Sequence, residues 1–215
     1  MKKGLTELVF ILDRSGSMRG LEADTIGGFN AMLAKQIRGE GEVIVSTVLF
    51  DNRFEVLHNR LPIQAVAPMT PREYFVRGST ALLDAIGRSI AKIANIQQIL
   101  PVSEQAEKVL FVITTDGMEN ASQEYNYDHL KLVIERQQEK YGWEFLFLGA
   151  NIDATATAGK FGIRAERTAN YHHDKAGTQL NFDVLSETIT NYRKSKKIED
   201  HWKAAIDADY SNRSK

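Results

Sequence analysis

The chain has 215 residues, of which 43% are hydrophobic and 26% charged, a composition typical of a single globular domain with a buried core. Its 27 Lys and Arg residues nearly balance its 28 Asp and Glu residues, for a net charge of −1, so charge gives no reason to expect nucleic acid or a membrane as partner. The absence of cysteine excludes disulfides, thiolate metal sites and a cysteine nucleophile.

Continuous apolar runs alternate with helical patterns along most of the chain. The runs are rich in Val, Ile, Leu and Phe, as are parallel strands buried on both faces; they are Leu8–Leu12, Val43–Phe50, Val109–Thr114 and Trp143–Gly149. Asp51-Asn52 signals a tight turn, so Arg53–His58 is predicted to return as an antiparallel edge strand. A weaker pattern over Arg164–Thr168 predicts a short last strand.

Apolar residues at helical spacing lie between and after these strands. Three of the stripes end before helix stop signals, which are Gly39 with Gly41, Pro101 and Gly142. The four predicted helical stripes are Ile26–Ile37, Leu83–Leu100, Leu130–Ile134 and Leu185–Tyr192.

The alternation of strands and helices predicts a three-layer α/β fold. We expect a doubly wound, Rossmann-like, mostly parallel sheet of about six strands, with one antiparallel edge strand and helices on both faces. Residues 1–194 contain no internal repeat or long linker and are expected to form one domain. Residues 195–215 form a polar tail in which Ile198, Trp202 and Ile206 recur at four-residue spacing. This spacing predicts a short helix docked on the body or on a partner.

Carboxylate and hydroxyl residues stand at three of the predicted element boundaries. In FILDRSGSM, residues 10–18, a strand ends at Asp13, and Ser15 and Ser17 follow at alternate positions. Thr80 precedes the second helix, and Asp116 follows the strand in VITTDG. Ligands of an open α/β sheet bind at the carboxyl ends of its strands, so these side chains are expected to converge there. Such hard oxygen ligands suit Mg²⁺, with Mn²⁺ or Ca²⁺ as alternatives.

Three short motifs, taken together and in this order, resemble the metal-ion-dependent adhesion site (MIDAS) of von Willebrand factor A domains, the family that includes integrin I domains. The resemblance implies that the three hydroxyls, of Ser15, Ser17 and Thr80, contact the metal directly. It also implies that the two aspartates support the metal directly or through water, and that an open coordination position accepts an acidic side chain of a partner protein. The motifs are Asp13-x-Ser15-x-Ser17, Gly78-x-Thr80 and Thr115-Asp116-Gly117.

The resemblance extends roughly from Leu8 to Tyr192 and leaves out the tail. It predicts a metal-dependent protein-binding module without catalytic residues, rather than an enzyme. One alternative is a metal-dependent hydrolase acting on a phosphorylated substrate at the same site, for which the sequence offers no convincing general base. Another is that the metal only ties the loops together.

A cytoplasmic location is expected. The apolar run after the basic start, Leu8–Leu12, is too short for the core of a signal peptide, and no later segment is long and apolar enough to span a membrane. The resemblance is therefore to the intracellular bacterial and phage members of the family, and we expect neither a membrane nor nucleic acid as partner.

Other site motifs fail on inspection. A phosphoaspartyl phosphatase would need a second Asp after Asp13, and an EF-hand beginning there would need Gly in place of Met18. The segment Ala154–Phe161 lacks the first Gly and the final Ser or Thr of a P-loop. Neither Gly-x-Ser-x-Gly nor His-Glu-x-x-His occurs.

Several further polar and aromatic residues have an expected role outside the metal site. Asp84, Glu119 and Asn120 are candidate rim residues. The pair His172-His173 is not expected to bind a metal, because adjacent side chains seldom point the same way and no third ligand stands at a suitable spacing. Arg14 and Arg19 are expected to be solvated surface charges. Tyr171 and Trp202 are expected to pack against other residues.

Overall fold

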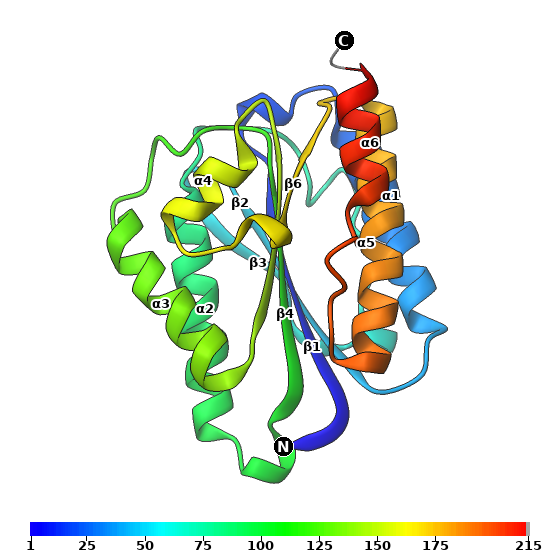
Figure 1. Ribbon diagram of the computed structural model, residues 1–215, viewed down its shortest axis with the longest axis vertical. Coiled ribbons are helices and arrows are strands. Elements are labelled where there is room, and N and C mark those ends of the chain that lie inside the picture. Colours follow the sequence, from blue (N-terminus) through cyan, green and yellow to red (C-terminus); the bar gives the residue numbers. More distant parts are fainter. Residues whose placement is uncertain (214–215) are drawn as a thin grey trace.

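The computed structural model describes residues 1–213 as three layers, a central sheet between two layers of helices (Figure 1). The strands are β1 (Lys2–Asp13), β2 (Val43–Phe50), β3 (Phe54–Pro62), β4 (Ala106–Thr115), β5 (Glu144–Ala150) and β6 (Thr168–Tyr171). The helices are α1 (Glu22–Ile37), α2 (Leu82–Ile99), α3 (Tyr127–Tyr141), α4 (Ala154–Lys160), α5 (Lys175–Ser195) and α6 (Ala204–Arg213).

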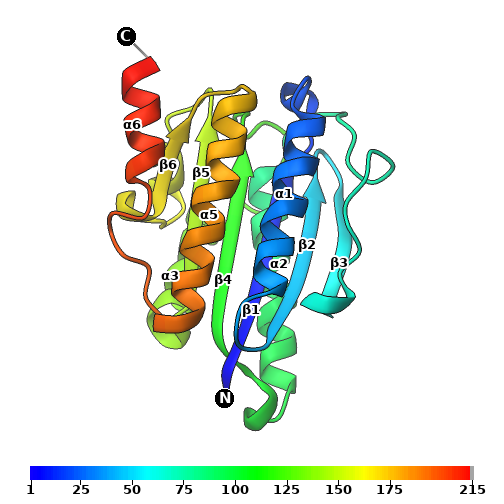
Figure 2. The same cartoon turned by 90° about the vertical axis from the view of Figure 1, so that its right-hand side faces the viewer.

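The sheet has six strands in the order β3-β2-β1-β4-β5-β6 (Figure 2). All neighbours are parallel except β3, which pairs antiparallel with β2 at one edge. The predicted doubly wound, mostly parallel α/β sheet with one antiparallel edge strand is therefore confirmed. In this topology the carboxyl ends of β1 and β4, which are direct neighbours, lie side by side.

Two hydrophobic cores fill the space between the layers, one on each face of the sheet. In β1, Leu8, Phe10 and Leu12 pack on the face covered by α1 and α5. The alternate residues Val9 and Ile11 pack on the face covered by α2, α3 and α4 (Figure 1). Burial on both faces is the reason that these strands are continuous apolar runs in the sequence.

The structure differs from the predicted elements near the end of the sheet. The last strand is β6, Thr168–Tyr171, which shares only Thr168 with the predicted strand Arg164–Thr168. Residues Ala165–Arg167 instead form a 3-10 turn, and the Arg167 side chain is buried, where it donates to Glu144 Oε2 at 2.9 Å. The sequence pattern also did not predict α4, whose amino end is capped by Asp153.

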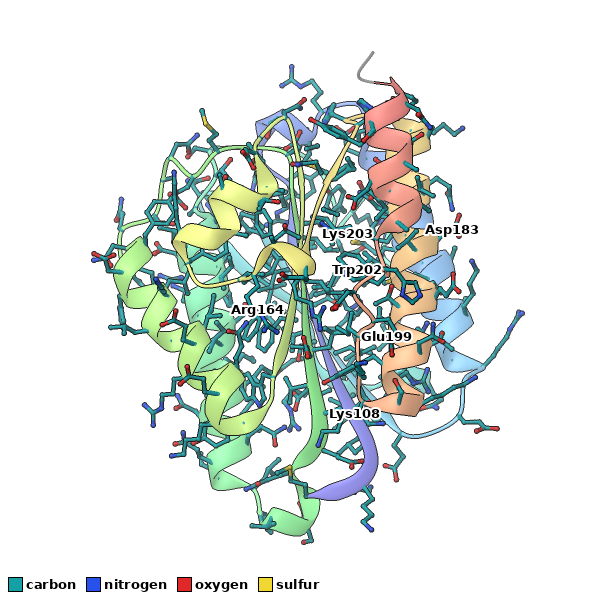
Figure 3. The ribbon with its side chains drawn as sticks, viewed as in Figure 1. Lys108, Arg164, Asp183, Glu199, Trp202 and Lys203 are labelled. Atoms are coloured by element: carbon teal, nitrogen blue, oxygen red, sulfur yellow. The ribbon has the colours of Figure 1, made fainter. Side chains whose placement is uncertain are left out.

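The tail folds back onto the body. Ile198 and Ile206 are each 1% exposed, and α6 contacts β6 and α5. Trp202, in the segment that joins α5 to α6 (Figure 3), donates from its indole N–H to the Glu166 carbonyl at 2.8 Å. None of the helices within residues 1–213 is long and apolar enough to cross a membrane.

Candidate metal centre

The carboxyl ends of β1 and β4 bring the first and the third motif together. Leu12 lies opposite Thr114 in the parallel ladder, so Asp13 and Thr115 leave the sheet at the same edge. The Thr115 hydroxyl donates to Asp13 Oδ2 at 2.6 Å, and the Ser15 amide donates to Asp13 Oδ1 at 2.6 Å. Both oxygens of this fully buried carboxylate therefore accept hydrogen bonds, one from the end of β4 and one from the loop after β1.

The two serine hydroxyls extend this network to the second carboxylate. Ser15 Oγ and Ser17 Oγ lie 2.9 Å apart in a hydrogen bond. Ser17 Oγ in turn donates to Asp116 Oδ1 at 2.5 Å. Asp116 is 2% exposed and Ser15 is 1% exposed, whereas Ser17 reaches the surface. The centre is thus buried on the protein side and accessible at Ser17.

Gly117 marks the point on which the three hydroxyls converge. A Cβ atom at this position would lie 3.0 Å from Ser17 Oγ, 3.0 Å from Thr80 Oγ1 and 3.8 Å from Ser15 Oγ. The structure therefore places all five predicted residues, from three separate loops, around one small region at the edge of the sheet. Their role as metal ligands remains a prediction.

Backbone clamps hold Thr80 against the loop that follows β4. The Thr80 amide donates to Asn120 Oδ1 at 2.9 Å, and the Asn120 amide donates to the Thr80 carbonyl at 3.0 Å. Glu119 accepts from the Leu83 amide at 2.9 Å. The carboxylate of Asp84 accepts from three successive backbone amides, at positions 123, 124 and 125. The three candidate rim residues thus fix the loop to the start of α2.

Burial gives both carboxylates an environment that favours a cation. Burial raises the pKa of Asp13 to about 6, although the hydrogen bonds from Thr115 and Ser15 act in the opposite direction. Burial also raises the pKa of Asp116, opposed by the Ser17 hydroxyl and then by His173. A bound dication would compensate the charge of both groups, as it does at other carboxylate sites.

Arg14 corrects one expectation from the sequence. Instead of lying solvated at the surface, its side chain is fully buried. Its guanidinium pairs with Asp51 at 3.2 Å and with Glu55, and it donates to the Glu73 carbonyl at 2.9 Å. A buried charge is tolerated when partners of opposite sign satisfy it, and Arg14 has two. It anchors the loop between Asp13 and Ser15 rather than facing a partner protein.

His173 is the site residue that the sequence analysis missed. It follows β6, and its Nδ1 atom lies 2.9 Å from Asp116 Oδ2. No spacing in the sequence places it near the other motifs, because β6 is separated from β4 by β5 in the sheet. The available signal was weaker: polar residues at the carboxyl end of a parallel strand lie at the ligand-binding edge.

The residues present fit a divalent cation of the hard type. The donors are two carboxylates and three hydroxyls, which are oxygen ligands. Asp116 Oδ2 is a buried carboxylate oxygen that makes no hydrogen bond in the described chain. It lies 2.9 Å from the His173 ring nitrogen and keeps its capacity to bind an ion. Within residues 1–213 no three His, Asp or Glu side chains gather into a metal cluster, so an ion at this position would need the hydroxyls as ligands.

Comparison with known proteins identifies the fold. No protein-family model matches the chain and no curated protein matches it in sequence. Among solved structures, a von Willebrand factor type A protein from Catenulispora acidiphila superposes with a TM-score of 0.60 at 16% identity, over 86% of this chain and 42% of that one. The von Willebrand factor domain of a type V pilus tip protein from Porphyromonas gingivalis superposes with a TM-score of 0.60 at 12% identity. The match covers 91% of this chain and 98% of that domain.

A third neighbour is proximal thread matrix protein 1 from the mussel byssus, solved with a zinc-occupied MIDAS motif. It gives a TM-score of 0.59 at 12% identity and covers 86% of this chain. The chain spans 46% of that protein and 42% of the Catenulispora protein, so it corresponds to less than half of either. At these identities the likeness shows the fold alone, and the chain has the fold of von Willebrand factor A domains.

Proposed function

We propose that this chain is a metal-dependent protein-binding module whose MIDAS-type site holds Mg²⁺ or a similar dication and uses it to coordinate an acidic residue of a partner protein. The observation that carries the proposal is the convergence of three hydroxyls on Gly117, beside two buried carboxylates. The zinc-occupied MIDAS of the mussel protein, on the same fold, supports a metal at this edge of the sheet.

Each group of the site has a distinct part in this function. Ser15, Ser17 and Thr80 would hold the ion through neutral oxygens, and Asp116 would hold it through its carboxylate. Asp13, whose two oxygens are already occupied by hydrogen bonds, would orient the loop and balance charge. With few anionic ligands, a dication stays electron-deficient, which is the chemistry needed to attract a partner's carboxylate.

Gly117→Ala tests the metal site with the smallest change that the chain offers. The added methyl group would occupy the space between the Ser17 and Thr80 hydroxyls, so Mg²⁺ binding measured by calorimetry should be lost while the circular dichroism spectrum stays unchanged. Thr80→Val should weaken binding by removing one oxygen at almost constant shape. The matched control is Gly27→Ala, where a Cβ meets nothing within 4 Å. Equal Mg²⁺ affinity in all four proteins would overturn the proposal.

The partner's acidic residue is tested with the same variants. Proteins retained by the immobilised chain in Mg²⁺, and released by EDTA, should not be retained by Gly117→Ala. In a partner found this way, replacement of one Asp or Glu by its amide should abolish binding, because a metal–carboxylate bond concentrates the binding energy at one residue. Partners that bind equally in EDTA would speak against the proposed mode. The expected cytoplasmic location is part of this proposal and is tested by cell fractionation.

One observation favours a second candidate, the metal-dependent hydrolase. His173 lies beside Asp116 and is partly exposed, so an imidazole is available next to the site as a general base. In this reading, hydrolysis of p-nitrophenyl phosphate should require a divalent metal and disappear in both Gly117→Ala and His173→Ala. Background hydrolysis with every divalent metal is the result that the binding module predicts.

A further inference from the structure

His173 and Asp116 form an unusual contact next to the proposed metal. His173 Nδ1 and Asp116 Oδ2 lie 2.9 Å apart, and both atoms are buried. Neither atom has a hydrogen-bond partner within residues 1–213. Buried polar atoms nearly always make hydrogen bonds, so two such atoms at ion-pair distance that make none, even with one another, require an explanation.

We propose that His173 supplies an imidazole nitrogen to the cation held at Asp116, so that this site accepts transition metals such as Zn²⁺ or Co²⁺ through mixed nitrogen and oxygen ligation. The inference rests on the proposed metal-dependent function and adds the class of metal. Imidazole suits Zn²⁺, Cu²⁺ and Ni²⁺, whereas hydroxyls and carboxylates alone suit Mg²⁺, Mn²⁺ and Ca²⁺.

The distances agree with two ligands of one ion. Neighbouring ligands of a six-coordinate ion with bonds of about 2.1 Å lie about 3.0 Å apart, and the His173–Asp116 contact has this length. Asp116 also joins the two donor sets, because its Oδ1 accepts from the Ser17 hydroxyl and its Oδ2 faces the imidazole. A cation at this carboxylate is therefore within reach of oxygen and nitrogen donors.

The loop that carries His173 is fixed on both sides, as a ligand-bearing loop should be. His172 stacks on Tyr210 of α6 with ring centroids 4.8 Å apart, and its Nε2 lies 3.2 Å from the Tyr210 carbonyl. Asp174 caps α5 by accepting from the Gly177 amide at 2.8 Å, and Arg213 of α6 pairs with Asp174 at 2.9 Å. The imidazole between these anchors has little freedom to turn away from Asp116.

Gly177 allows this loop to close. A Cβ at Gly177 would lie 2.2 Å from the carbonyl oxygen of His172, so any other residue would push the loop off the amino end of α5. The position of His173 is thus specified by the backbone as well as by its neighbours.

The test compares two metals in the untagged 215-residue chain after removal of metal with EDTA. Affinities for Mg²⁺ and Zn²⁺ are measured by calorimetry and chelator competition for the parent, His173→Ala and the matched control His201→Ala, at an exposed position between α5 and α6. His173→Ala should lose at least about 10- to 100-fold in Zn²⁺ affinity, which is the loss when only a hydrogen-bond partner of a metal ligand is removed, while Mg²⁺ affinity stays close to that of the parent. His201→Ala should change the affinity for neither metal by a comparable factor. Melting in EDTA checks that the variants fold.

A spectroscopic measurement reports the nitrogen directly. With Cu²⁺ as probe, pulsed electron paramagnetic resonance should show the remote nitrogen of one imidazole in the parent and in His201→Ala, and should not show it in His173→Ala. Unchanged Zn²⁺ affinity and an unchanged spectrum in His173→Ala would overturn the inference, as would tighter binding of both metals, which would make the imidazole a competitor of the ion. If Mg²⁺ still binds in a Gly117-dependent way, the proposed function survives that failure. If no divalent metal binds the parent, both fail.

Discussion

Arg14 carries a full positive charge in the protein interior. In the sequence it stands between Asp13 and Ser15, two residues of the candidate metal centre. Its guanidinium meets Asp51, Glu55 and the Glu73 carbonyl, and it lies over the exposed ring of Phe75 at 5.3 Å. Side chains alternate along an extended chain, so Asp13 and Ser15 can face the site while Arg14 holds the loop to β2 and β3. We therefore expect this buried charge to stabilise the fold around the candidate centre.

Arg14→Met tests that dependence. Removal of one member of a buried ion pair leaves the other charge uncompensated, which costs about 3 kcal/mol or more. Asp51 keeps Arg77 at 2.7 Å, so we expect a loss near this lower value, measured by urea denaturation in EDTA. The control is Arg19→Met, at an exposed position of the same loop, which should change stability by no more than about 0.5 kcal/mol. Equal losses in the two variants would show that Arg14 is not an anchor.

At the residue scale, the sequence predicts the candidate centre only where the information is local. Asp13, Ser15 and Ser17 stand together in one motif, and their alternation indicates a shared direction. The burial of Arg14 and the approach of His173 to Asp116 depend on partners far away in the chain. No local pattern encodes such contacts, so the sequence alone predicts a surface position for Arg14 and no contact between His173 and Asp116.

At the scale of elements, α6 supports the loop that carries His173. Helix α6 contacts the edge strand β6 and the long helix α5, and Figure 2 shows it beside β6. Its one fully buried hydrophobic residue, Ile206, joins the core on the α1 and α5 face. Its far end contacts the 172–174 loop through Tyr210 and Arg213. The tail is thus linked to the edge of the candidate metal centre.

Ile206→Asp should detach α6 without unfolding the sheet. A charge at a position that is 1% exposed cannot remain buried without a partner, so the helix should leave the body. Hydrogen exchange should then become faster in β6 and in residues 172–174, while β1 and β4 stay protected. Ser211→Asp places the same charge at an exposed position of α6 and should leave exchange unchanged. Equal protection in both variants would show that α6 does not stabilise the loop.

Elements were predictable where burial on both faces imposes a long apolar run. The apolar runs in the sequence agree closely with the bounds of β2, β4 and β5 in the structure. The antiparallel edge strand β3 follows from the turn at Asp51-Asn52. The last strand was misplaced because Arg164–Thr168 carries few apolar residues and one of its charges, Arg167, turns inward to pair with Glu144. Helix α4 is only seven residues long and too rich in small residues to show an apolar stripe.

At the scale of the whole molecule, the proposed ion would join segments that are distant in sequence. The loops after β1 and β4 and the segment before α2 each contribute donors, and they meet where the topology sets β1 beside β4. Two carboxylates are buried at this junction, and burial raises the pKa of both, which means that their charged forms are unfavourable there. Ion binding should therefore contribute to the stability of the folded chain as a whole.

Metal should accordingly raise the free energy of unfolding by mass action. An ion that binds only the folded state adds about 2.7 kcal/mol when present at about 100 times its dissociation constant, and urea denaturation across a Mg²⁺ series measures this gain. Asp116→Asn should show no gain in Mg²⁺. In EDTA this variant should be at least as stable as the parent, because it removes a buried charge at constant shape. In the parent, that charge is stabilised mainly by the Ser17 hydroxyl and the nearby His173 imidazole. Glu139→Gln, at an exposed position of α3, should keep the full gain. A parent protein whose stability is the same in EDTA and in saturating Mg²⁺ would mean that the two buried carboxylates are stabilised by the protein alone, and that no ion links the loops.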